Sequence, residues 1–184
     1  MAQRLFVAVR PPERVLDVVA GLARPGVTGL RWTAREQWHV TLRFLGAVEE
    51  ATPVVEALRW VADGRPGGSG PAPEAELGPA VRRFGNRVLH LPVTGLDGLA
   101  SRVLEATADM GRPAEDREFS GHVTLARVAK RTRVDLRQLA GEALPGPAEW
   151  RRWTVRDVCL VESRLAPTGA RYEVVERFPL ASSA

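Results

Sequence analysis

The sequence is poor in the side chains that form cross-links or bind soft metals. Cys159 is the only cysteine in 184 residues, which excludes an intramolecular disulfide and a metal site built from several cysteines. It lies in an apolar stretch, residues 158–161, where we expect a buried strand. The chain also has no apolar run long enough to cross a membrane as a helix. We therefore expect a cytoplasmic protein.

Lysine is almost absent, and arginine carries nearly all of the positive charge. Lys130 is the only lysine, and the 26 basic residues exceed the 22 acidic ones by a net charge of +4. Arginine is the better residue for bidentate contacts with phosphate. A GC-rich genome would also raise the arginine, alanine, glycine and proline content together. The charge balance therefore gives only weak support for a nucleic-acid partner.

Histidine is scarce too, and its distribution is not random. The chain has three histidines, and two of them begin the same tetrapeptide, His-Val-Thr-Leu, at residues 39–42 and 122–125. A repeated string of this kind indicates an internal duplication. The third histidine, His90, has no such context, and we expect it to be a structural or surface residue.

Each copy of the tetrapeptide has the alternation of a β-strand. Successive side chains of a strand point to opposite faces, so Val40 and Leu42 can enter a core while His39 and Thr41 share the other face. Residues 122–125 repeat this pattern. Two such strands related by a two-fold axis would present two imidazoles and two hydroxyls to one cleft.

This set of side chains suits displacement at a phosphodiester. The reaction needs a base for the attacking group, an acid for the leaving group and donors for the phosphate oxygens. Histidine, with an unperturbed pKa of about 6.5, can serve as acid or base near neutral pH. Threonine hydroxyls can donate to the non-bridging oxygens. We therefore predict catalysis without a metal or other cofactor.

The rest of the chain predicts a duplicated α+β domain. Apolar periodicity predicts helices at residues 12–22, 54–62, 96–110 and 133–143, and strands at 4–9, 74–84, 87–93, 150–162 and 172–178. The Gly/Pro-rich segment 64–73 is predicted to be a loop. We expect residues 1–184 to form a single domain with an N-terminal repeat at about 1–63 and a C-terminal repeat at about 74–184.

The two motifs and their flanks resemble the two-histidine (2H) phosphoesterase superfamily. Residues 4–8, 31–32 and 39–46 are similar to the opening strand and first motif of the RNA 2′,3′-cyclic phosphodiesterases, also called 2′-5′ RNA ligases (LigT-like). Residues 122–127 are similar to their second motif. The resemblance implies a bilobal fold with antiparallel sheet in two pseudo-symmetric lobes, helices packed outside and a central cleft.

The resemblance also implies a reaction: hydrolysis of a terminal 2′,3′-cyclic phosphate on RNA, such as a tRNA fragment, or on a cyclic nucleotide, to a 2′-phosphate. His39 would protonate the leaving 3′-oxygen, His122 would activate water, and Thr41 and Thr124 would hold the phosphate. The reverse reaction would join RNA ends weakly. The residues alone do not distinguish acid from base, because the two histidines have nearly identical sequence neighbours.

Three further residues are candidates for substrate binding. Phe44 and Arg127 follow the family's motifs, but strand alternation places Phe44 on the core side and Arg127 opposite His122 unless the strand bends. Arg43, by the same alternation, shares the face of His39 and is favoured on physical grounds.

Other functions remain open from the sequence. A related phosphodiesterase could act on ADP-ribose cyclic phosphate or on 2′-5′ linked oligonucleotides. A non-catalytic RNA-binding module could keep the cleft without turnover. In each case we expect a monomer that has no contact with a membrane.

Overall fold

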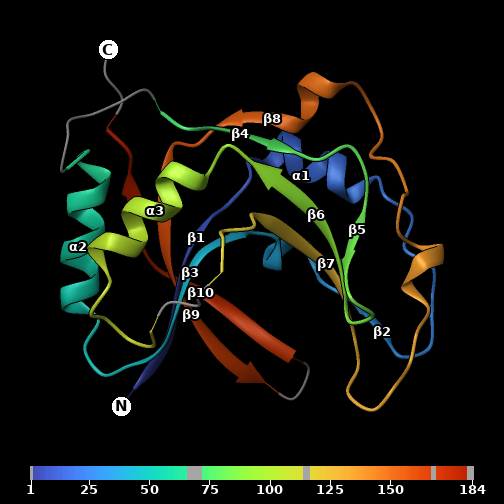
Figure 1. The fold of residues 1–184 in the computed structure, drawn as a ribbon, viewed down its shortest axis with the longest axis horizontal. Helices are drawn as coiled ribbons and strands as arrows, with labels where there is room; N and C mark the ends of the chain where they lie inside the picture. The colour runs from blue at the N-terminus through green and yellow to red at the C-terminus, as the bar shows by residue number, and fades with distance from the viewer. Residues whose placement is uncertain (1, 66–71, 114–116, 167–168, 182–184) are drawn as a thin grey trace.

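A computed structural model describes residues 2–65, 72–113, 117–166 and 169–181 and consists of a curled sheet with three helices outside it (Figure 1). Strand order along the 10-stranded sheet is β10-β9-β1-β3-β7-β6-β4-β8, with β2 added to β7 and β5 added to β6. Every strand pair is antiparallel. The strands are β1 (Gln3–Val9), β2 (Leu30–Trp32), β3 (Val40–Val48), β4 (Glu74–Leu77), β5 (Arg82–Phe84), β6 (Val88–Thr94), β7 (His122–Val128), β8 (Arg152–Thr154), β9 (Asp157–Ala166) and β10 (Gly169–Pro179).

The two motif copies lie where the two halves of the sheet meet. β3 and β7 are joined at a single pair, Val40 with Val123, and the path continues from them on each side. The expected α+β, bilobal architecture is therefore confirmed. The chain crosses between the halves, because β9 pairs with β1 and so places residues 157–179 beside the N-terminal motif. Residues 66–71 of the predicted loop 64–73 lie outside the described part.

The helices bury one face each, as their periodicity predicts. α1 (Glu13–Ala20) buries Val15, Leu16, Val18 and Val19. α2 (Thr52–Ala62) and α3 (Asp97–Ala106) lie side by side against the sheet. No described helix is long and apolar enough to cross a membrane.

Three sequence predictions are wrong in this part of the fold. Residues 74–84 form two short strands, β4 and β5, and not one. Residues 133–143 contain only a short 3₁₀ helix, Leu136–Gln138, because the segment has a weak apolar face. Residues 150–162 do not form one strand. A 3₁₀ helix, Ala148–Arg151, leads into β8, which pairs with β4, and the chain then turns into β9, which pairs with β1.

Candidate active site

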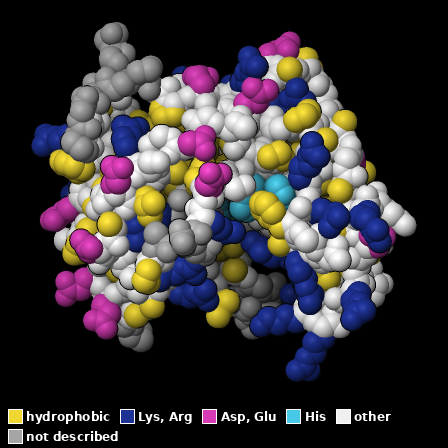
Figure 2. All heavy atoms as spheres, in the orientation of Figure 1, with side chains coloured by type: hydrophobic (Ala, Val, Ile, Leu, Met, Phe, Trp, Pro, Cys, Tyr) yellow, Lys and Arg dark blue, Asp and Glu magenta, His cyan; other side chains and the backbone are white. Residues whose placement is uncertain are grey.

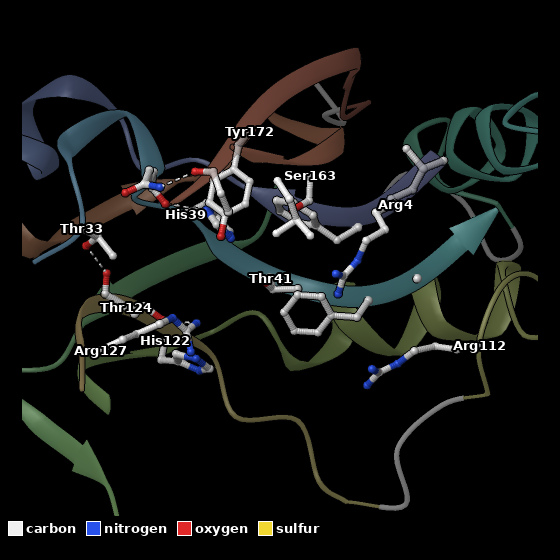
Figure 3. A pocket seen from close by; sticks show the side chains of 17 residues that line it. Arg4, Thr33, His39, Thr41, Arg112, His122, Thr124, Arg127, Ser163 and Tyr172 are labelled. Atoms are coloured by element: carbon white, nitrogen blue, oxygen red, sulfur yellow. Dashed lines mark hydrogen bonds between the residues drawn. The ribbon is translucent and has the colours of Figure 1, made fainter. Parts of the chain in front are cut away.

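His39 and His122 line the same cavity, which has a volume of about 260 Å³. His39 directly precedes β3, and His122 is the first residue of β7. Thr41 and Thr124 line the cavity beside them (Figure 3). The structure thus brings together the four residues that the repeated motif singles out.

Both imidazoles are held in the same way. Nδ1 of His39 lies 2.6 Å from the carbonyl oxygen of Gln37, and Nδ1 of His122 lies 2.7 Å from that of Ser120. A carbonyl oxygen can only accept a hydrogen bond, so Nδ1 carries the proton in each neutral ring. Nε2 is thereby left with a lone pair for proton exchange, which is the arrangement that a general acid or base requires.

The cavity is built for an anion. Arg4, Arg112 and Arg127 line it, and none of its described lining residues is acidic. Arginine and lysine side chains gather around the hollow below the histidines in Figure 2. The hydroxyl of Thr124 lies 3.5 Å from Nη2 of Arg127. A phosphate held by the threonine hydroxyls would therefore sit in a field of positive charge.

Aromatic rings surround His39. The centroid of its ring lies 4.8 Å from that of Phe6 and 5.1 Å from that of Tyr172, with the Tyr172 ring perpendicular to it. Burial lowers the pKa of His39 to about 4, helped by the charges of His122, Arg127 and Arg10 and opposed by the Gln37 carbonyl. His39 is therefore neutral at pH 7 in the protein without substrate.

His122 has a different environment. Phe84 lies edge-on to it at 4.9 Å, and His90 lies 5.4 Å away in a T-shaped contact. Its pKa is lowered by burial, then by the charges of Arg127 and Arg117. His90 is 5% exposed and stacks on Phe84 at 3.8 Å. It does not line the cavity, so its contribution is to pack against the His122 ring.

A β-bulge reverses the faces expected for Arg43 and Phe44. In the pairing of β1 with β3, Ala8 opposes Thr41 and Val7 opposes Arg43, so Leu42 is the additional residue. Phe44 therefore lines the cavity, and it is 47% exposed. Strand alternation predicts it on the core side, and that prediction is wrong.

The placement of Arg43 on the cleft face is wrong for the same reason. Its side chain is 5% exposed and its guanidinium donates to backbone carbonyls beyond and within α3, with the shortest bond 2.8 Å to Leu104. It borders a neighbouring cavity of about 250 Å³ but not the one that holds both histidines. Arg43 ties β3 to the end of α3.

A bulge in β7 turns Arg127 toward the cavity, whereas the bulge in β3 turns Arg43 away from it. In the pairing of β6 with β7, His90 opposes Thr124 and Leu89 opposes Ala126, which leaves Leu125 as the additional residue. Arg127 is therefore on the side of the histidines and lines the cavity. The strand is irregular at this point, and simple alternation does not hold.

Several cavity residues were not predicted from the sequence. Tyr172 reaches the cavity from β10. Ala170, also on β10, accepts a hydrogen bond of 2.7 Å through its carbonyl from the side-chain amide of Gln37. Phe6 faces the cavity from β1, opposite Phe44. The pairing of β10 and β9 with β1 brings Tyr172 here, and no local pattern signals such a long-range contact.

No group of three or more His, Cys, Asp or Glu side chains that could hold a metal occurs among the described residues. Cys159 is buried, and burial raises the pKa of its thiol to about 12. It packs with Phe6, Ala8 and Val161. As expected, this cysteine is a buried strand residue.

Comparison with known proteins agrees with this geometry. A sequence model of the 2′-5′ RNA ligase superfamily matches residues 11–166. TT0787 of Thermus thermophilus is similar with a TM-score of 0.77 and 29% identity, over 98% of this chain and 100% of that one. Escherichia coli LigT complexed with 3′-AMP has a TM-score of 0.71 and 25% identity, over 99% and 100%. LigT complexed with phosphate has a TM-score of 0.68 and 26% identity, over 98% and 99%.

No curated protein sequence matches the chain. The family model nevertheless spans most of its length, and the solved structures share its fold from end to end. The chain therefore belongs to the 2′-5′ RNA ligase superfamily, within the 2H phosphoesterases.

Proposed function

We propose that this protein hydrolyses terminal 2′,3′-cyclic phosphates of RNA to 2′-phosphates, without a metal or cofactor. The observation that carries the proposal is the pair of imidazoles whose Nδ1 atoms are fixed by carbonyls, at one arginine-lined cavity with two threonine hydroxyls. That LigT has been solved with 3′-AMP and with phosphate supports a nucleotide-sized phosphate ligand in a site of this fold.

The proposed reaction is one in-line displacement. Nε2 of His122 takes a proton from water as the water oxygen bonds to phosphorus. The bond from phosphorus to the 3′-oxygen breaks, and His39 delivers a proton to that oxygen. The products are a 2′-phosphate and a 3′-hydroxyl. Thr41 and Thr124 donate to the phosphate oxygens, and Arg127 stabilises their charge.

His39 must be protonated to act as the acid, although its pKa without substrate is about 4. A bound phosphodiester carries a negative charge beside the ring, and an opposite charge within a few ångströms raises the pKa of a histidine. Substrate binding would thus raise the pKa of His39 and favour its protonated form, which acts as the acid. With a 5′-hydroxyl in place of water as the attacking group, the same displacement would join a cyclic phosphate end to that hydroxyl through a 2′-5′ linkage, which is a weak ligase activity.

The proposal is tested by incubating the purified protein, in EDTA, with RNA that ends in a 2′,3′-cyclic phosphate. Cyclic nucleotides, ADP-ribose cyclic phosphate and 2′-5′ linked oligonucleotides are assayed in parallel. We expect a 2′-phosphate product. A 3′-phosphate would reverse the orientation of the substrate, and turnover of only the other substrates would move the activity within the superfamily. A folded protein that binds RNA but turns over none of these would be an RNA-binding module.

A further inference from the structure

A second cavity, larger than the catalytic one, opens beside the start of α1. It has a volume of about 600 Å³ and is formed by residues 10–14, the turn between β8 and β9, and Arg177 of β10. It shares no lining residue with the cavity that holds the two histidines. The reaction proposed above makes no use of it.

This cavity has an excess of positive charge. Its charged lining residues are Arg10, Arg14, Arg156, Arg177, Glu13 and Asp157. The two ion pairs within this set are long, at 3.6 Å for Arg10 with Glu13 and 3.6 Å for Arg177 with Asp157. Long pairs at a solvent-accessible site are weak and leave the arginines able to bind another anion.

The contacts of Arg156, Arg14 and Glu13 also leave this cavity with an excess of positive charge. The side chain of Arg156 makes no hydrogen bond or ion pair to any described residue, and that of Arg14 donates to the carbonyl of Arg152, at 2.6 Å. The carboxylate of Glu13 is drawn to Arg35, from which Oε2 accepts a hydrogen bond at 2.7 Å. Its negative charge is thus partly compensated outside the cavity by Arg35, which also pairs with Asp17.

The first turn of α1 adds backbone donors. Pro12 occupies the N-cap position and contributes no side-chain hydrogen bond, so the first N–H groups of the helix have no side-chain cap. The N-terminal end of a helix carries a partial positive charge and favours phosphate. Together with four arginines around one cavity, this end of α1 gives the cavity a set of donors that suit phosphate groups.

The site is close to the catalytic cleft. Val9 pairs with Val40 at the end of the β1–β3 ladder, so Arg10 follows at the level of His39. The charge of Arg10 is one of the causes that lower the pKa of His39. An RNA strand whose end lies at the histidines would therefore pass near the arginines of this second cavity.

We propose that this cavity binds backbone phosphates of the RNA whose end occupies the catalytic cleft, an identification of the ligand that rests on the proposed function. The protein would then hold its substrate at two places. The reactive phosphate lies at the histidine pair, and a phosphate further along the strand lies among Arg10, Arg156 and Arg177.

The test measures binding, so it does not depend on turnover. Fluorescence anisotropy would compare a single-stranded RNA ending in a 2′-phosphate with a 2′-mononucleotide, over a range of salt concentrations. The variants are Arg156→Gln, which removes no side-chain hydrogen bond or ion pair within the described fold, and Arg156→Gln/Arg177→Gln. Arg137→Gln is the control, since Arg137 is exposed, pairs with Asp135 and lies outside both cavities.

We expect the double variant to lose about tenfold in affinity for the RNA relative to the mononucleotide, and the salt dependence to decrease by about one to two phosphate contacts. The single variant should lose about half of that effect on a logarithmic scale. RNA affinity and salt slope equal to those of Arg137→Gln would overturn the proposal. So would a loss confined to the mononucleotide, because the site would then serve free nucleotides. If the protein does not hydrolyse the RNA but its RNA binding still depends on Arg156, only the proposed function is contradicted.

Discussion

The two copies of His-Val-Thr-Leu have the same sequence and the same local geometry, but different surroundings. In each, Nδ1 donates to the carbonyl two residues earlier, at 2.6 and 2.7 Å. His39 is enclosed by Phe6 and Tyr172 and has a pKa lowered to about 4. His122 lies beside Phe84 and His90, and burial together with the charges of Arg127 and Arg117 lowers its pKa.

This comparison separates what a motif determines from what the fold determines. The carbonyl two residues before each histidine fixes the tautomer, and the strand that carries the motif places both rings at the cavity. The segments packed against each copy then set the burial and the electrostatic field. The two rings thus share a motif but lie in different surroundings, and in an acid–base pair the surroundings can assign different roles to like groups.

The largest predicted effect comes from removing either ring. His39→Ala and His122→Ala should each lower kcat/KM by at least about 10²–10⁴ on the cyclic-phosphate RNA. The double variant should lose little more, because acid and base act in one step. Initial rates, with circular dichroism as the check on folding, test this. Near-normal activity of either single variant would mean that the two copies do not act as a pair.

The hydroxyls come next. Thr41→Val and Thr124→Val keep the shape of the side chain and remove the donor, and we expect a loss in kcat of about tenfold to a hundredfold for each. Thr→Ser at the same positions serves as the matched control and should recover most of the rate. A Val variant with unchanged kcat would assign that threonine to strand formation only.

The enclosure of His39 can be opened without changing the motif. Tyr172→Ala should admit water, so that the pKa of His39 rises from about 4 toward the unperturbed value of about 6.5. The pH profile of kcat/KM should be bell-shaped, and the limb set by His39 should move to higher pH in the variant. Phe84→Leu, made beside His122, is the matched change and should leave that limb in place. A flat profile between pH 5 and 9 would contradict both roles.

Stability should also depend on the buried histidines. The pKa values of His39 and His90 are both lowered to about 4, whereas unfolded histidine has a pKa of about 6.5. The unfolded state therefore binds more protons between these values, and the free energy of unfolding should fall as the pH drops from 6.5 toward 4. His90→Phe should reduce this fall by up to about 1.4 kcal/mol per pH unit, measured by urea unfolding. An identical pH dependence in the variant would show that the pKa of His90 is the same in the folded and unfolded protein.

The smallest effect is expected from chelation. EDTA should leave the rate unchanged, because the proposed acid, base and phosphate donors are all side chains of the two strands. A strong loss of activity that a divalent ion restores would contradict the mechanism.

The sequence was informative where chemistry and short-range pattern coincide. His39, Thr41, His122 and Thr124 precede the bulges of their strands, so simple alternation places them on one face. Arg43, Phe44 and Arg127 follow the bulges, whose positions depend on pairing with β1 and β6. Alternation therefore fails for all three.

The remaining differences have a similar origin. Tyr172 reaches the cavity only because the C-terminal strands return to the N-terminal half. Long-range pairing of this kind leaves no local periodicity to read. The second cavity is equally invisible in the sequence, since its arginines come from three distant segments.

The most direct test of the account is an NMR titration of the imidazoles, alone and with a 2′-nucleotide. The chain has only three histidines, so each can be followed separately. In the free protein we expect His39 to carry its proton on Nδ1 and to titrate near pH 4. The nucleotide should raise the pKa of both His39 and His122, because its phosphate faces both rings, and should leave His90 nearly unchanged. If only one of the two motif histidines responds, or if His39 titrates at its unperturbed pKa of about 6.5 in the free protein, the two copies do not form the unequal pair described here.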